Sequence, residues 1–198
     1  MNLDRRPVVP CQADKVASER VAVFCARSVD GLEALGRSLG GALKETIAAR
    51  PFLLLGLDGE LGAGKTTLAA ATLAALGVRS RVTSPTYGLV HAHSFGLGGT
   101  GRTVEVLHVD LYRLRRAAEL DELGLEDGVQ STPAAAGQVL LVEWFENARG
   151  RLGRPDLAFR LMHSQSGRLV NLRAHSEPGG RILRFLRGAI HHDLQLLS

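Results

Sequence analysis

One stretch of the sequence constrains the fold more than any other: residues 51–77, PFLLLGLDGELGAGKTTLAAATLAALG. It opens with a short apolar run, which is typical of a strand buried on both faces. Glycines follow that match the pattern G-x-x-x-x-G-K-[ST] from Gly59 to Thr66, and a segment rich in strong helix formers then closes on Gly77. A strand, a glycine loop and a helix in this order predict a loop whose backbone N–H groups wrap a phosphate chain.

Each residue type in this loop suits a phosphate ligand. Gly59, Gly62 and Gly64 let the backbone approach phosphates without a Cβ clash. We expect Lys65 to reach the β and γ phosphates and the Thr66 hydroxyl to sit on Mg²⁺. The alternative, a glycine-rich turn with a solvated lysine, is disfavoured because the flanking strand and helix agree with the loop.

A magnesium ion on a triphosphate also needs a carboxylate, typically at the carboxyl end of a neighbouring buried strand. Two acids follow apolar runs in this way: Asp110 after VEVLHV and Glu143 after QVLLV. Either acid alone also fits a residue that faces water or caps a helix. The sequence leaves open which of the two binds metal and which orients water.

The remaining residues predict further helices and strands. Leucines at helical spacing predict a first helix over residues 28–49, with Ser28 or Asp30 as its N-cap and a break or weakening at Gly40-Gly41. The other predicted elements are strands within residues 86–95, 102–112 and 138–144, an acidic helix within 117–129, an antiparallel hairpin within 156–175 and a final helix over 179–197.

These elements predict an α/β fold: a single P-loop NTPase-like domain with a central, mainly parallel sheet flanked by helices and an antiparallel C-terminal hairpin. The domain is expected to span residues 21–198. Residues 1–20 mix charge and proline without periodicity, so we expect a flexible N-terminal extension.

Composition argues against several other classes of protein. The longest apolar run, residues 52–57, is far shorter than the roughly 20 residues that cross a bilayer, so we expect no membrane association. The start of the chain has no apolar segment of a secretory signal, which favours a cytoplasmic location. Cys11 and Cys25 form no C-x-x-C pair and have no histidine at ligand spacing, so we expect free thiols and no zinc site.

The net charge of +4 is compatible with an anionic partner, although a compositional bias towards arginine explains it equally well. Two arginine groups could contact nucleic-acid phosphates, but solvated faces are favoured because no aromatic residues are interleaved with them. The histidines are expected to be structural or solvated, and those near the C-terminus to form a solvated last helical turn. The first arginine group is Arg113, Arg115 and Arg116, and the second is Arg181, Arg184 and Arg187. The histidines are His91, His93, His108 and His163, and the C-terminal segment is His191-His192-Asp193.

Several segments together resemble one known family. DGELGAGKTTLA, VTSPTYGLV, LHVDLYRL, ELGLED and LVEW occur in the order and spacing of the bacterial TsaE family, also called YjeE. That family is the ATPase component of the machinery that makes threonylcarbamoyladenosine in tRNA. The resemblance covers about residues 27–175. Its specificity comes from the combination of motifs after a Walker loop, which are S-P-T-Y, D-L-Y-R and E-W, rather than from any one of them.

The resemblance implies an ATP and Mg²⁺ site. Lys65, Asp110 and Glu143 would be catalytic, with Mg²⁺ held by Thr66 and Glu143 and with Asp110 linked to magnesium or orienting water. Residues 84–87 would form a switch-like segment near the γ-phosphate. The implied nucleotide-binding residues are Leu61, Gly62, Ala63, Gly64, Lys65, Thr66, Thr67, Ser84, Thr86, Tyr87 and Trp144.

The resemblance also implies TsaB and TsaD type proteins as partners, with ATP hydrolysis that is slow alone and partner-dependent and with tRNA contacted only indirectly if at all. One departure is Leu32, which occupies the place of a threonine that family members often carry near the adenine. Two alternatives stay open: a small-molecule or nucleoside kinase with an arginine-bearing lid at residues 113–116, and a non-hydrolytic, nucleotide-gated adaptor.

Overall fold

The computed structural model describes residues 19–78, 90–114, 119–122, 125, 135–189 and 191–198 of the 198-residue chain. Within this part, the strands form one eight-stranded sheet in the order β3-β4-β5-β2-β6-β7-β1-β8. The strands are β1 Val21–Ala26, β2 Phe52–Gly59, β3 Val90–Leu97, β4 Arg102–Asp110, β5 Ala135–Glu143, β6 Leu157–Ser164, β7 Gly167–Ala174 and β8 Leu194–Leu196. The helices are α2 Val29–Ala49, α3 Lys65–Leu76, α4 Glu119–Glu122, α5 Glu177–Arg187 and the 3₁₀ helix η1 Phe145–Ala148.

The centre of the sheet is parallel, which confirms the predicted architecture. β2 lies between β5 and β6 and is parallel to both, and β4 is parallel to β5. β3 is antiparallel to β4 at one side, and β7 is antiparallel to β6 as the predicted C-terminal hairpin. The carboxyl ends of β2, β4 and β5 therefore meet at one edge, where the glycine loop and the two predicted acids emerge.

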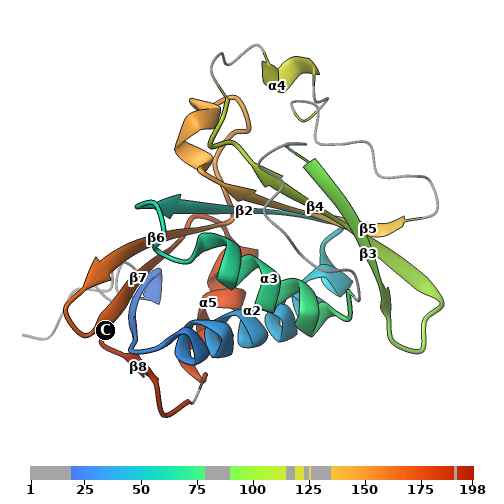
Figure 1. The fold of residues 1–198 in the computed structure, drawn as a ribbon. Coiled ribbons are helices and arrows are strands. Elements are labelled where there is room, and N and C mark those ends of the chain that lie inside the picture. The colour runs from blue at the N-terminus through green and yellow to red at the C-terminus, as the bar shows by residue number, and fades with distance from the viewer. Residues whose placement is uncertain (1–18, 79–89, 115–118, 123–124, 126–134, 190) are drawn as a thin grey trace, which may run out of the picture.

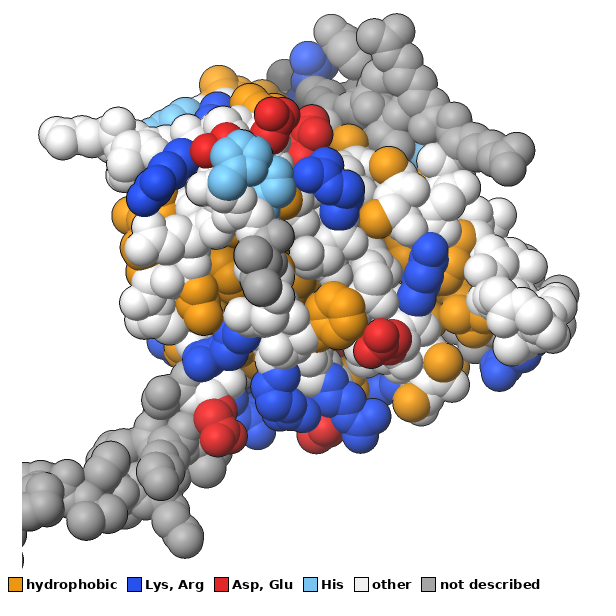
Figure 2. All heavy atoms as spheres, turned by 90° about the horizontal axis from the view of Figure 1, so that it is seen from below, with side chains coloured by type: hydrophobic (Ala, Val, Ile, Leu, Met, Phe, Trp, Pro, Cys, Tyr) orange, Lys and Arg blue, Asp and Glu red, His pale blue; other side chains and the backbone are white. Residues whose placement is uncertain are grey.

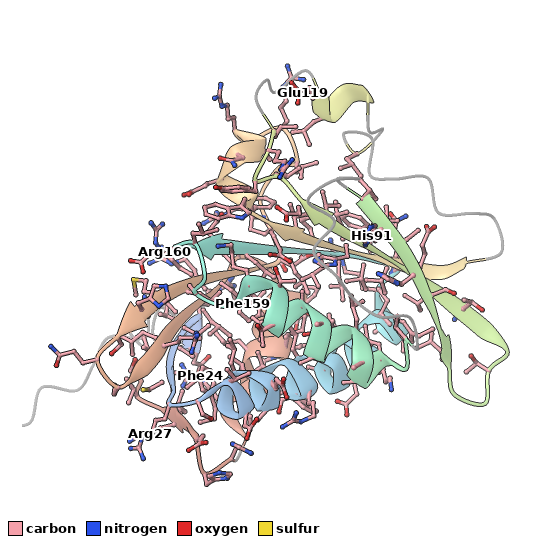
Figure 3. The ribbon with its side chains drawn as sticks, in the orientation of Figure 1. Phe24, Arg27, His91, Glu119, Phe159 and Arg160 are labelled. Atoms are coloured by element: carbon pink, nitrogen blue, oxygen red, sulfur yellow. The ribbon has the colours of Figure 1, made fainter. Side chains whose placement is uncertain are left out.

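The sheet separates two apolar layers (Figure 1). α2, α3 and α5 cover one face and bury the larger core, in which Phe24 and Phe159 are almost wholly inaccessible (Figure 3). α4 and η1 contribute Leu120 and Ala148 to a smaller core on the opposite face. Among the described residues, no helix has the length and apolar character needed to cross a bilayer.

The predicted break in the first helix is wrong. α2 runs without interruption from Val29 to Ala49, because its glycines serve the packing against α3 rather than a bend. A Cβ on Gly36 would lie 2.6 Å from the Cβ of Ala71, and one on Gly40 would lie 2.6 Å from that of Ala75. The close approach of the two helices offsets the cost of about 1 kcal/mol for glycine inside a helix.

The predicted final helix is too long. α5 ends at Arg187, and residues Leu194–Leu196 form β8 at the sheet edge, antiparallel to β1. β1 itself was not predicted, although it lies between β7 and β8. β8 has only three residues and β1 has six, and both pair with segments distant in the sequence, which local patterns do not report.

Asp193 is not part of a solvated helical turn. Ser28, the N-cap of α2, accepts a hydrogen bond from the backbone N–H of Gly31 and donates one to Asp193 Oδ2 over 2.6 Å. This bond from the Ser28 hydroxyl lowers the pKa of Asp193 below 3.8. The segment before β8 is thereby tied to the start of α2, and of the two predicted N-cap candidates, Ser28 and Asp30, the N-cap is Ser28.

Candidate functional site

The loop between β2 and α3 has the backbone geometry of a phosphate cradle. Gly59, Gly62 and Gly64 adopt positive φ values of 131°, 75° and 104°, a region that other residues rarely enter. A Cβ on Gly59 would collide with the carbonyl oxygen of Leu161, and one on Gly64 would collide with the side chain of Leu32. Only glycine fits at these two ends of the loop, and Leu61, Gly62 and Gly64 line the adjoining cleft.

Lys65, the first residue of α3, is held at the mouth of this loop. Its Nζ donates to the carbonyl oxygens of Gly59 and Glu60, each over 2.8 Å, and lies 3.6 Å from the centre of the Trp144 ring. Burial lowers the pKa of Lys65, while the nearby carboxylate of Glu143 acts in the opposite direction. The ammonium group is therefore fixed close to the acids rather than extended into solvent.

The structure brings the two predicted acids together with Thr66. Asp110 and Glu143 are register partners at the ends of β4 and β5, and both are almost fully buried. Thr66 Oγ1 donates to Glu143 Oε2 over 2.8 Å. Asp110 Oδ1 accepts from the backbone N–H of Tyr112 over 2.9 Å. A hydroxyl and two carboxyl groups thus meet beside the loop.

Trp144 and Tyr112 form a wall of the site. Their rings lie 5.0 Å apart, and Trp144 has a positive φ of 57°, which is unusual outside glycine. Together with the loop and the acids they enclose a cleft of about 350 Å³. The residues lining this cleft are Leu61, Gly62, Gly64, Lys65, Thr66, Thr67, Asp110, Tyr112, Glu143 and Trp144.

A second cavity of about 570 Å³ borders the first at Thr66 and Thr67. It runs between α2 and α3 and is lined by Glu33 and Arg37, among others. Leu32, which stands where family members often carry a threonine, does not line it: this side chain is 1% exposed and packs against the loop at Gly64. Leu32 therefore supports the loop from beneath.

The residues present fit a phosphate chain with Mg²⁺. Thr66 and Glu143 offer hydroxyl and carboxylate oxygens, which are the hard donors that Mg²⁺ prefers. In the part of the chain that the structure describes, no group of three or more His, Cys, Asp or Glu side chains is arranged to hold a metal ion. The two protein donors, Thr66 and Glu143, suit a cation that takes its remaining ligands from water and phosphate oxygens, as Mg²⁺ does.

Some predicted site residues do not line the cleft or lie outside the described residues. Ala63 is fully buried and its N–H donates to the carbonyl oxygen of Glu60, so it supports the loop without facing the cleft. The predicted switch segment, Ser84, Pro85, Thr86 and Tyr87, falls in residues 79–89 and is not described, as is true of Arg115 and Arg116.

Sequence reasoning missed two residues of the site, Tyr112 and His108. His108 was expected to be structural or solvated; the structure places it in a fully buried position, with its Nε2 2.8 Å from Glu143 Oε1, a contact that was not predicted. The signal was present in the spacing: His108 precedes Asp110 by two residues on one strand, so both side chains point to the same face.

Of the other predicted histidines, His163 lies beside the glycine loop, with its Nε2 3.2 Å from the carbonyl oxygen of Leu61 and its backbone N–H donating to Glu60 Oε2 over 3.2 Å. His91, labelled in Figure 3, lies on β3 and is the register partner of His108. Burial lowers the pKa of the nearby His93. Arg181 and Arg184 both approach Glu177, at 2.7 and 3.7 Å. On the face shown in Figure 2, basic side chains are spread with acidic ones between them.

Comparison with known proteins identifies the family. Residues 26–170 match the model of the family described as "Threonylcarbamoyl adenosine biosynthesis protein TsaE". The chain belongs to the TsaE family. Its residues are 32% identical to the TsaE protein of Haemophilus influenzae over 66% of this chain and 76% of the relative. The TsaE protein of Mycobacterium bovis is 36% identical over 63% of this chain and 71% of the relative.

A solved structure supports the same fold. The crystal structure of YdiB from Bacillus subtilis superimposes with a TM-score of 0.61 at 21% identity, covering 85% of this chain and 95% of that one. The TsaE family is involved in tRNA threonylcarbamoyladenosine biosynthesis. Membership of the TsaE family therefore confirms the resemblance that the segments around the glycine loop indicated.

Proposed function

We propose that this TsaE-family chain is a Mg-ATP-binding P-loop ATPase that drives turnover of a TsaB-TsaD type complex during tRNA threonylcarbamoyladenosine formation. The observation that carries the proposal is the meeting of the Thr66 hydroxyl with the Glu143 carboxylate, 2.8 Å apart, beside a loop whose glycines exclude side chains. A triphosphate with its metal needs a main-chain cradle, a hydroxyl and an acid in this arrangement.

The proposed roles follow from the positions of the side chains. Mg²⁺, when bound, neutralises charge on the phosphate oxygens, and Thr66 and Glu143 would hold it. Lys65 adds a fixed positive charge where negative charge develops during phosphoryl transfer. Asp110 lines the same cleft as the register partner of Glu143, and we assign it the orientation of the attacking water. The Trp144 and Tyr112 rings line one side of the cleft.

The cavity between α2 and α3 offers a place for the nucleoside. It begins at Thr66 and Thr67, the residues that also border the phosphate cleft. With about 570 Å³ it lies within the range of volumes typical of small-molecule sites. The nucleotide would then extend from the loop along the outer surface of α3.

The test is ATP hydrolysis measured with the TsaB and TsaD type partners present. Lys65→Ala and Asp110→Ala are expected to abolish phosphate release while circular dichroism shows the fold unchanged. Normal hydrolysis by both variants would overturn the assignment of the site. A labelled γ-phosphate recovered on a metabolite would instead identify a kinase. Full support of tRNA modification by a non-hydrolysable ATP analogue would identify a nucleotide-gated adaptor.

A further inference from the structure

The carboxylate of Glu143 is held by two donors from different parts of the chain. Thr66 Oγ1, on α3, donates to Oε2 over 2.8 Å, and His108 Nε2, on β4, lies 2.8 Å from Oε1. We propose that His108 is a positioning residue that fixes the orientation of the Glu143 carboxylate and so keeps Oε2 directed at Thr66. This inference rests on the proposed function, because it concerns how the same site is prepared for Mg²⁺.

The direction of the hydrogen bond follows from the chemistry of the two groups. An ionised carboxylate only accepts hydrogen bonds, so the Nε2 of His108 must carry the proton that is shared with Glu143. A bond to an ionised acceptor is stronger than one between neutral groups. Both side chains are nearly inaccessible, at 0% and 2% exposure, so water does not compete for Oε1.

Packing alone does not account for a histidine at this position. Its Nδ1 is buried and has no hydrogen-bond partner among the described residues, and leaving a buried polar atom unpaired costs stability. A leucine or phenylalanine would fill the same space without that cost. The polar interaction that compensates is the one between Nε2 and Glu143.

The orientation of Glu143 matters because its side chain has several rotatable bonds. Without the anchor at Oε1, the carboxylate is free to rotate, and Thr66 remains its only side-chain partner in the described part of the site. Residues that orient metal ligands in this way typically affect metal affinity by about 10- to 100-fold when they are replaced. Nucleotide binding without metal should be unaffected, because His108 does not line the cleft.

The experiment measures the Mg²⁺ requirement of ADP binding. Trp144 is the only tryptophan of the chain and lies in the cleft, so its fluorescence reports binding directly. We expect His108→Leu to raise the Mg²⁺ concentration for half-maximal ADP binding by about 10- to 100-fold. Affinity for ADP in EDTA should stay within about twofold. His108→Gln, whose amide nitrogen can donate from nearly the place of Nε2, should restore most of the Mg²⁺ dependence.

His91→Leu is the matched control, because His91 is the cross-strand neighbour of His108 and makes no hydrogen bond to Glu143 in the structure. An unchanged Mg²⁺ requirement in His108→Leu would overturn the inference. So would an equal change in His91→Leu. If the wild-type protein binds ADP without any response to Mg²⁺, the proposed function fails first. If His108→Leu does not fold, His108→Asn replaces it, because the shorter asparagine amide cannot reach Glu143. Equal Mg²⁺ requirements of His108→Gln and His108→Asn would then overturn the inference.

Discussion

Thr66 Oγ1 and Glu143 Oε2 lie 2.8 Å apart although 77 positions separate the two residues in the chain. β2 and β5 are parallel neighbours, and Leu57 is the register partner of Glu143. The loop that follows β2 therefore returns beside the end of β5, and the first turn of α3 reaches the acid. This hydrogen bond joins the phosphate loop to an acid supplied by a distant strand.

The first prediction concerns the hydroxyl at this junction. Thr66→Val keeps the size of the side chain and removes the hydroxyl that is proposed to bind Mg²⁺, so ATP turnover should fall by about 100-fold or more, because losing a metal ligand removes several kcal/mol of transition-state stabilisation. Thr66→Ser keeps the hydroxyl and should retain most of the activity. Phosphate release with saturating partners is the measurement, and equal activity of the Val and Ser variants would contradict the role of the hydroxyl.

The second prediction compares Gly59 of the loop with two glycines outside it, Gly77 and Gly98. Gly59→Ala should lower the free energy of unfolding by about 3 kcal/mol or more, because its φ is 131° and its Cβ would collide with Leu161. Gly77→Ala meets no neighbouring atom but keeps a φ of 96°, so it should cost only about 1–2 kcal/mol. Gly98→Ala has open space and should be nearly neutral.

Urea unfolding of the three glycine variants and the wild type tests this ranking. Equal stability of Gly59→Ala and Gly98→Ala would show that the loop does not have the backbone conformation described for it.

The third prediction separates two adjacent glycines of α2. Gly40→Ala should destabilise the protein, because its Cβ would lie 2.8 Å from the carbonyl oxygen of Thr72 as well as against Ala75. Gly41→Ala should stabilise it by about 0.5–1 kcal/mol, since alanine favours the helix and its nearest neighbour, Phe185, is at 3.4 Å. Thermal unfolding should give shifts of opposite sign, and a gain in both variants would show that α2 and α3 are not in close contact at Gly40.

The fourth prediction concerns pH. The hydrogen bond from Ser28 lowers the pKa of Asp193 below 3.8, so ionised Asp193 stabilises the folded state. This contribution is fully present above about pH 4 and is lost as the pH falls through the lowered pKa. The difference in unfolding free energy between the wild type and Asp193→Asn should therefore shrink below about pH 4. A difference that stays constant from pH 6 to pH 3 would contradict the role of this carboxylate.

Local pattern was enough to predict the part of the site that is continuous in the chain. The run before Gly59, the glycines of the loop and the helix after Lys65 each follow from short-range preferences of the backbone. Asp110 and Glu143 were found as well, since each ends an apolar strand. Ser28 as an N-cap depends only on the residues just after it. The C-terminal hairpin of β6 and β7 also follows from alternation around a turn.

Other features were decided by contacts between distant segments. β8 has only three residues, too few to show a pattern, and β1 is a six-residue apolar run whose place in the sheet depends on pairing with segments far along the chain. In the sequence, Gly40 indicates a break in the helix. The structure shows instead that glycine is needed there because α3 packs directly against it. From the sequence alone, His108 cannot be told from an ordinary core histidine. The alignment of β4 with β5 is what brings Glu143 to its Nε2.

The sequence by itself determined the glycine loop, the strand and helix around it, and the family, because these depend on neighbouring residues and on their order. Only the tertiary structure decided that α2 is continuous, that the chain ends on an edge strand, and that Thr66 and His108 hold the two oxygens of Glu143. The physical reason is that helix packing, strand pairing and hydrogen bonds between separate strands depend on distances in space, which spacing along the chain does not specify.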